Sequence, residues 1–225
     1  MKHIFALLCF GCLLLPSCNS TKVTVSTEPI IIEYTSAAAP WLTDMYYCAE
    51  EKVVNTEQRG ADFLDPQTVD LAIRIGQPTN LTFPAYQIDS EDILVIVNRQ
   101  NPINRLTAEE VHDLFTGSIQ TWQEINGSNT TVQVWVFSSG EDVQQIFNQS
   151  ALEGSPVTST ARLATGMEEM AQAIAKDVDA VGILPRHWKA GNVSDVFTVA
   201  TVPVLALTPP EPQEAVQEML ACLQK

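Results

Sequence analysis

Residues 93–122 read ILVIVNRQNPINRLTAEEVHDLFTGSIQTW, and no other part of the chain constrains the architecture as strongly. The first five, residues 93–97, are a continuous β-branched and leucine run of the length expected for a buried strand. Thr107 and Glu110 have the spacing of a capping box, in which a hydroxyl and a carboxylate satisfy free amides at the start of a helix. Gly117 suits the end of that helix. The stretch therefore predicts a strand, a crossover, a helix and a turn.

Strand-like and helix-like segments alternate along the rest of the chain. Further strands are expected at residues 29–34, 69–75, 132–137, 180–184 and 197–207. Further helices are expected at residues 39–55, 140–149, 167–178 and 214–224, with loop at residues 76–92. This alternation predicts an α/β fold with mainly parallel sheets flanked by helices.

Two extended crossings, near Val97 and near Ala200, divide the chain into two parts. Lobe 1 is expected to contain residues 28–96 and 200–225, and lobe 2 residues 97–199. Ligands of open α/β sheets bind beyond the carboxyl ends of the strands. Two such lobes facing each other predict a cleft between them.

The residue pattern of the crossover is more specific than the strand and helix that it predicts. The pattern NPxNxLTxxxxxxxFxGxIxxW, at residues 101–122, closely resembles the linker between lobes in solute-binding proteins of the phosphate-importer type. The resemblance implies a two-lobed periplasmic-binding-protein-like fold whose hinge is a pair of crossing strands. It also implies a monomer that binds a small phosphate-like anion in the interlobe cleft and passes it to an ABC permease. Neither a cofactor nor an enzymatic activity is expected.

The composition narrows the class of partner. The chain has 225 residues, of which 45% are apolar, and a formal charge of −15. A chain of this length can bury the cores of two small lobes. The negative charge argues against nucleic acid as a partner. It does not exclude a small anion, because nearby amides outweigh a distant diffuse charge. His112 and His187 are isolated and lack metal-ligand spacing, so we expect no metal site.

Residues 1–17 have the form of a secretory signal peptide. The apolar run at residues 4–15 follows basic residues and is too short to span a bilayer. Leu-Pro-Ser-Cys at residues 15–18 resembles the bacterial lipobox. It implies lipidation of Cys18 and anchoring at the extracytoplasmic face of the cell membrane, with residues 18–27 as a tether. An ordinary secreted or uncleaved leader is the alternative.

Two other cysteines remain after the leader. Cys48 and Cys222 each lie on the apolar stripe of a predicted helix. In an oxidising compartment they could pair and tie the C-terminal helix to the first helix. Two buried thiols are the alternative.

The turn after the first strand is a candidate ligand site. Thr35, Ser36 and Ala37 bring hydroxyls, small side chains and free amides to the start of a helix, which is the chemistry of an anion site. Ordinary helix capping by Thr35 or Ser36 would explain the same residues without a ligand.

A second strand-to-helix turn contains Ser138, Ser139 and Gly140. It falls where phosphate-binding relatives carry a Ser-Gly-Thr loop, but Glu141 stands at the Thr position. Glu141 and Asp142 suit a helix N-terminus through the helix dipole, so a self-capped helix is the alternative. If either points into the cleft, it repels phosphate. A hydrolase built on these serines lacks the G-x-S-x-G turn.

Arg74, near the carboxyl end of its strand, is a third candidate because a guanidinium suits an oxyanion. A surface ion pair is the alternative for this residue. For the whole protein, the alternative function is a ligand-sensing or signalling module of the same fold without a role in transport.

Overall fold

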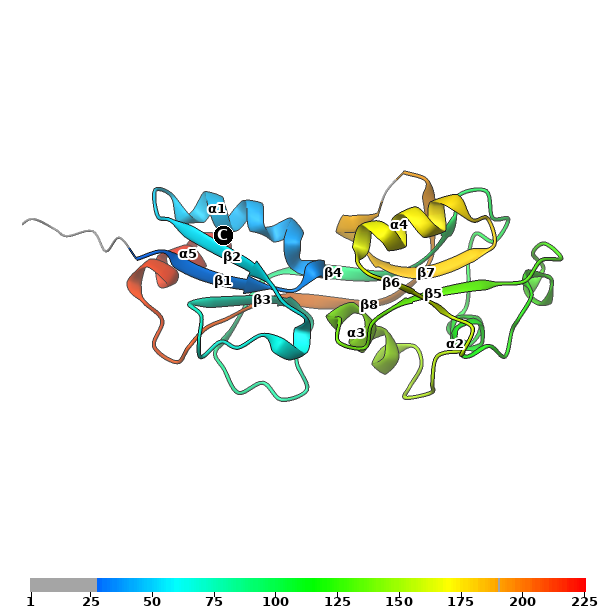
Figure 1. Ribbon diagram of the computed structural model, residues 1–225, viewed down its shortest axis with the longest axis horizontal. Coiled ribbons are helices and arrows are strands. Elements are labelled where there is room, and N and C mark those ends of the chain that lie inside the picture. The colour runs from blue at the N-terminus through cyan, green and yellow to red at the C-terminus, as the bar shows by residue number, and fades with distance from the viewer. Residues whose placement is uncertain (1–27, 190) are drawn as a thin grey trace, which may run out of the picture.

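The structure, a computed structural model, describes residues 28–189 and 191–225, and Figure 1 shows two halves joined by two long strands. The predicted signal peptide, Cys18 and the tether lie outside these residues. The strands are β1 (Ile30–Tyr34), β2 (Val54–Gln58), β3 (Leu71–Ile75), β4 (Ala85–Asn98), β5 (Gln133–Phe137), β6 (Arg162–Ala164), β7 (Ala180–Pro185) and β8 (Val193–Leu207). The α-helices are α1 (Leu42–Ala49), α2 (Ala108–Thr116), α3 (Asp142–Ser150), α4 (Met167–Lys176) and α5 (Glu214–Leu223). Short 3-10 helices are η1 (Ser36–Trp41), η2 (Ala61–Phe63), η3 (Trp122–Ile125) and η4 (Arg186–Trp188).

The strands of the described residues form one sheet in the order β2-β1-β3-β8-β4-β7-β5-β6. In lobe 1, β1 pairs in parallel with β2 and β3. In lobe 2, β5 pairs in parallel with β6 and β7. The pairs β3–β8, β4–β8 and β4–β7 are antiparallel. Each lobe is therefore a mainly parallel α/β unit, and the long antiparallel pair β4–β8 makes the two units one continuous sheet.

The crossing between the lobes follows from the partners of β4 and β8. β4 pairs with β7 from Ile93 onward, and β8 pairs with β3 from Val204 onward. Between these points, residues 90–92 and 201–203 pair with each other. The sequence predicts the first crossing near Val97, a few residues after the position of residues 90–92 in the structure. The difference arises because the buried run at the start of the crossover motif already pairs within lobe 2.

The predicted bounds of two other segments differ from those in the structure. The expected helix over residues 39–55 stops at Ala49, and a strand follows it. Glu50 has a positive φ of 55°, which an α-helix does not accommodate. Residues 76–92 are predicted as loop, whereas β4 begins at Ala85. The first half of β4 is largely exposed, so it lacks the apolar run that marks a strand in sequence.

The crossover motif folds as its sequence predicts. Ile93 to Val97 of β4 are completely buried. At the start of α2, the Glu110 amide donates to Thr107 Oγ1 at 3.2 Å, and the Thr107 amide donates to Glu110 Oε2 at 2.7 Å. Gly117 ends α2 with a φ of +85°. The local signals of a capping box and a C-terminal glycine are thus sufficient to fix both ends of this helix.

A covalent bond joins the two helices that cover lobe 1 on the same side. Cys48 of α1 and Cys222 of α5 form a disulfide, with Cα atoms 5.7 Å apart and 174 residues between them in sequence. The bond holds the C-terminal helix against the helix that follows the turn at residues 35–37. That turn is therefore supported by a covalent link to the far end of the chain.

Candidate functional site

The carboxyl ends of the parallel strands in the two lobes face each other. β1 and β3 end at Tyr34 and Ile75 in lobe 1, and β5 ends at Phe137 in lobe 2 (Figure 1). The turns that follow these strands meet between the lobes. The candidate turns at residues 35–37 and 138–140 therefore lie on opposite sides of the same interface.

Asp142 is the centre of this interface. Its Oδ2 accepts a hydrogen bond from Thr35 Oγ1 at 2.6 Å and one from the Ile75 amide at 2.9 Å. The Val143 amide donates to the other oxygen, Oδ1, at 2.8 Å. Both Asp142 and Thr35 are completely buried. A carboxylate at the start of α3, in lobe 2, is therefore bound by a hydroxyl and an amide of lobe 1.

Arg74 adds a positive charge beside this carboxylate. The side chain is only 6% exposed, and its Nε donates to the Gly76 carbonyl at 3.1 Å. Burial lowers the pKa of the guanidinium, while the charges of Asp142 and Asp62 raise it. Burial also raises the pKa of Asp142, against the hydrogen bonds from Thr35 and Ile75 and the charge of Arg74. Buried charges of opposite sign thus support each other here, and Arg74 is not a surface ion pair.

Glu141 makes a second contact of the same kind. Ser36 Oγ donates to Glu141 Oε2 at 3.0 Å. Burial raises the pKa of this half-buried carboxyl, the Ser36 hydrogen bond lowers it, and the charge of Asp142 raises it further. Consecutive hydroxyls of lobe 1 are therefore engaged by consecutive carboxylates of lobe 2.

The other predicted site residues contribute backbone or lie outside the contact. The Ala37 carbonyl accepts from Trp188 Nε1 at 3.0 Å, and the Gly140 carbonyl accepts from the Ala61 amide at 2.9 Å. Ser138 and Ser139 are exposed. The structure therefore brings Thr35, Ser36, Ala37, Arg74 and Gly140 together between the lobes, and leaves both serines on its edge.

Neither Asp142 nor the Ile75 amide is among the site residues that the sequence predicts. The available signal was the pair of acids directly after Gly140, where the resembling proteins carry Thr. An acid in the first turn of a helix is ordinary, so this signal does not by itself predict a bond to Thr35, 107 residues away.

A second contact between the lobes lies beside the crossing strands. Glu91 of β4 is 1% exposed, and its Oε2 lies 2.7 Å from His187 Nδ1 of η4. The His187 ring packs against Trp41 of η1, with ring centroids 4.7 Å apart. Trp41 Nε1 donates to Asp89 at 2.9 Å. These contacts add to those of Asp142 and Glu141 in holding the two lobes together.

Open space lies elsewhere on the described surface. Depressions of about 690 and 560 Å³ are on lobe 2, the first lined by Arg99, Asn104 and Asp195 among others and the second by residues 105–108 and 195–198. The predicted site residues line neither of them. Among the described residues, no group of three or more His, Cys, Asp or Glu could hold a metal ion.

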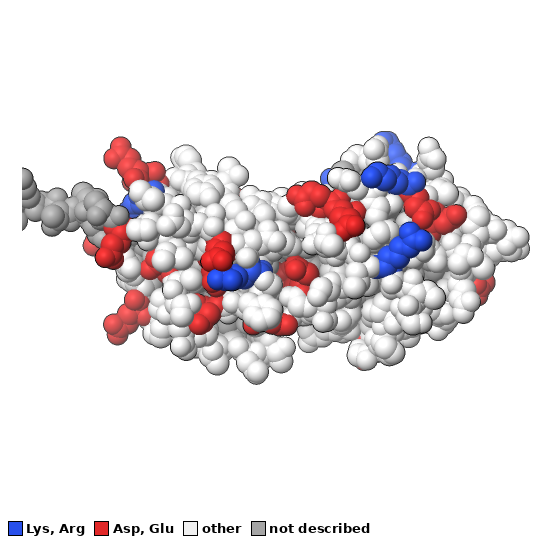
Figure 2. Space-filling view, in the orientation of Figure 1, with Lys and Arg blue, Asp and Glu red and all other residues white. Residues whose placement is uncertain are grey.

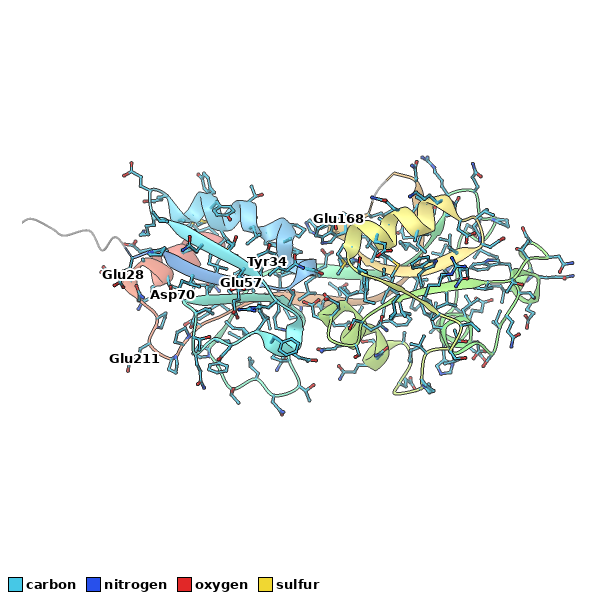
Figure 3. All side chains as sticks on the ribbon, viewed as in Figure 1. Glu28, Tyr34, Glu57, Asp70, Glu168 and Glu211 are labelled. Carbon is cyan, nitrogen blue, oxygen red and sulfur yellow. A yellow bond between two sulfur atoms is a disulfide. The ribbon has the colours of Figure 1, made fainter. Side chains whose placement is uncertain are left out.

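Acidic side chains lie beside the contact between the lobes on one face of the molecule (Figure 2). On the face shown in Figure 2 they lie on both sides of the waist where the two halves meet. Figure 3 places Glu57 of lobe 1 and Glu168 of lobe 2 on either side of this waist, and both are exposed. Both acids add negative charge beside the contact, although Glu57 is paired with Arg59 at 3.0 Å.

The two α/β lobes and the facing pair of turns define a two-lobed, periplasmic-binding-protein-like fold. A family model described as a PBP superfamily domain matches residues 87–218, which is more than half of the chain. The chain belongs to the PBP superfamily. Comparison with curated proteins finds no match.

Solved structures share the fold. One, from Clostridium perfringens with bound phosphate, is of a protein assigned as a phosphate ABC transporter substrate-binding protein; its TM-score is 0.78 at 16% identity, over 87% of this chain and 93% of that one. An ABC-type phosphate transport receptor from Vibrio cholerae has a TM-score of 0.70 at 17% identity, with the same coverage. The regulatory domain of Synechocystis CcmR, in complex with 2-PG, has a TM-score of 0.66 at 13% identity, over 87% and 95%. At these identities the likeness shows the fold.

Proposed function

We propose that this protein is an extracytoplasmic solute-binding protein that captures a small phosphate-like oxyanion between its lobes and delivers it to an ABC permease. The ligand-binding residues would be Thr35, Ser36, Ala37, Arg74 and the turn at residues 138–140. The observation that carries the proposal is the convergence of the Thr35 hydroxyl, the Ile75 amide and the Arg74 charge on one carboxylate. Membership of the PBP superfamily and the likeness to phosphate receptors support it.

The chemistry of these groups selects an anion. A hydroxyl and a backbone amide both donate, and a buried guanidinium supplies charge without accepting. Hydrogen bonds to a charged partner contribute about 1.5–3 kcal/mol each when they are shielded from water. A neutral solute could accept from the hydroxyl and the amide, but it would leave the buried charge of Arg74 without a compensating charge, and a cation would be repelled. A small oxyanion satisfies all three groups.

Anion titrations of the mature protein test this proposal. Calorimetry or thermal unfolding with phosphate, sulfate, molybdate, tungstate and organic anions should identify one or more that bind. Arg74→Met should weaken that binding about tenfold or more, because the change removes a charge-assisted contact. Arg162→Met is the matched control, since Arg162 is exposed and lies over the Trp135 ring in lobe 2. The proposal fails if none of these anions binds the natural sequence or any variant of Asp142.

We further propose that Cys18 carries the lipid that holds the protein at the membrane. No helix in the described part of the chain is long and apolar enough to cross a bilayer. Several acyl chains on Cys18 would give stable anchoring, whereas one chain would bind only reversibly. Incorporation of labelled palmitate into the natural sequence, and its loss in Cys18→Ala, would support this anchor. A Cys18→Ala protein that stays in the membrane fraction would contradict it.

A sensing or signalling role is the second candidate. Two observations favour it: the donors of lobe 1 are engaged by the chain's own carboxylates, and the fold is shared with the regulatory domain of CcmR. Crosslinking in intact membranes distinguishes the two roles. Capture of a permease supports delivery of a solute, and capture of a histidine kinase supports signalling.

A further inference from the structure

We propose that Asp142 is a built-in competitor for the anion site, so that a solute anion reaches Thr35 and the Ile75 amide only when the Asp142 carboxylate withdraws. The inference rests on the proposed function, because it assumes that the groups around Asp142 accept a free anion. It adds a specificity determinant to that site.

The bonds of Asp142 are not those of a helix cap. Glu141 is the N-cap residue of α3, and Asp142 is the first residue inside the helix. One Asp142 oxygen bonds locally, to the Val143 amide. The other accepts two hydrogen bonds from lobe 1, across sequence separations of 107 and 67 residues. The local bond engages one amide of the first turn of α3, whereas the two long-range bonds cap no amide of that helix and require a different explanation.

The partners of that oxygen are the groups expected to hold an anion. Thr35 follows β1, and Ile75 is the last residue of β3, so both lie at the carboxyl ends of neighbouring parallel strands. Arg74, next to Ile75, is buried, and the charge of Asp142 raises the pKa of its guanidinium against the effect of burial. A solute anion bound by these groups and the Asp142 carboxylate would occupy the same volume. Because Asp142 is completely buried there, the two cannot be bound at once.

Glu141 repeats the arrangement independently. Its carboxylate accepts from Ser36, the second hydroxyl of the lobe 1 turn. A solute that displaced only Asp142 would still meet the negative charge of Glu141 beside it. The pair therefore selects for an anion that offers more acceptors than a carboxylate does, and it lowers the apparent affinity by the fraction of molecules in which Asp142 is withdrawn.

Removal of the competing carboxylate tests the inference. The binding of inorganic phosphate and of sulfate is measured by calorimetry for the natural sequence, Asp142→Ala and Asp142→Asn. We expect Asp142→Ala to bind at least one of the two anions ten times more tightly than the natural sequence, or to bind where the natural sequence does not. Asp142→Asn keeps the size and an acceptor oxygen but loses the charge, so it should show a smaller gain.

Glu168→Ala is the matched control for a general change of charge. Glu168 is also acidic and in the first turn of a lobe 2 helix, and Figure 3 places it at the waist between the lobes. In the described structure its carboxylate makes no hydrogen bond to lobe 1. Glu168→Ala should leave the affinity within about twofold of the natural value, because an exposed charge is screened by salt.

The possible results separate the inference from the proposed function. Equal binding by the natural sequence and the Asp142 variants overturns the inference and leaves the proposed function standing. A gain in Glu168→Ala as large as that in Asp142→Ala also overturns it. If no variant binds any anion, the proposed function fails and the inference fails with it. Should Asp142→Ala not fold, Asp142→Asn decides the question by the same comparison.

Discussion

The two turns that meet between the lobes have the same local architecture and opposite chemistry. Each follows a parallel strand and leads into a helix. The turn of lobe 1 offers the hydroxyls of Thr35 and Ser36, and the turn of lobe 2 ends in Glu141 and Asp142. One turn donates and the other accepts. The difference teaches that two side chains decide the chemistry of a strand-to-helix turn. Two hydroxyls make the turn able to bind an anion, whereas two carboxylates make it supply the negative charge itself.

The largest effect is expected when the buried acceptor is removed. Asp142→Ala leaves the buried Thr35 hydroxyl and the Ile75 amide without their shared acceptor, which should lower the free energy of unfolding by about 1–3 kcal/mol for each donor. Glu141→Ala removes one hydrogen bond of a half-buried carboxylate and should lower it by about 0.5–1.5 kcal/mol. Urea unfolding of both variants measures the contrast. Equal losses would mean that the two acids do not differ in their roles.

The covalent support of the lobe 1 turn gives the next effect. The disulfide ties α1, which follows that turn, to α5, whereas α3 after the lobe 2 turn has no such bond in the described residues. Cys48→Ser combined with Cys222→Ser should lower the free energy of unfolding by about 2–4 kcal/mol. The same unfolding curve should result from reducing the natural protein. A double variant as stable as the natural protein would show that the bond does not constrain this lobe.

A smaller effect is expected where lobe 1 touches α3. Gly76 has a φ of +71°, and a Cβ there would lie 2.9 Å from Ile146 Cδ1 of α3. Gly76→Ala should lower the free energy of unfolding by about 1–3 kcal/mol, through backbone strain and overpacking. Gly154→Ala is the control, since Gly154 has a φ of +87° and open space around it. If both variants lose the same amount, the contact with α3 contributes nothing and backbone strain explains the result.

The smallest effect concerns pH. The pKa of Asp142 is raised in the folded protein above its ordinary value, chiefly by burial. Such a group contributes stability that is full below the unfolded pKa, near 4, and is lost as pH rises through the folded pKa. The difference in unfolding free energy between the natural protein and Asp142→Asn, which cannot ionise, should therefore fall as pH rises from 4 to about 8. Urea titrations across this range measure it, and a difference that rises with pH would mean that the folded protein favours the ionised carboxylate, which contradicts a raised pKa of Asp142.

The crossover motif could be predicted because its determinants are local. Thr107, Glu110 and Gly117 specify their helix within a few residues of sequence. The exposed first half of β4 could not be predicted, because its pairing with β8 is a tertiary contact that leaves no apolar pattern. Membership of the binding-protein fold was predicted from the same motif and is confirmed.

Only the residues that line the interface between the lobes could be predicted, and only in part. Thr35, Ser36 and Arg74 were chosen for their chemistry, and the structure brings them to the interface between the lobes. Their assignment to a ligand stays a prediction. The engagement of Thr35 by Asp142 joins residues far apart in sequence, and an acid at a helix start has a sufficient local explanation. Only the three-dimensional arrangement reveals that the donors already have an acceptor.

The shared strands β4 and β8 set the kind of movement that can separate the two turns. Irregularities in their pairing, between Gln87 and Asp89 and between Ile93 and Leu94, lie on either side of the crossing. Strands bend most readily at such irregularities. Withdrawal of one lobe from the other would therefore bend the antiparallel pair β4–β8 near its middle. A force applied at one end of the molecule would be transmitted through β4 and β8 to the other end, without loading the turns at residues 35–37 and 138–140.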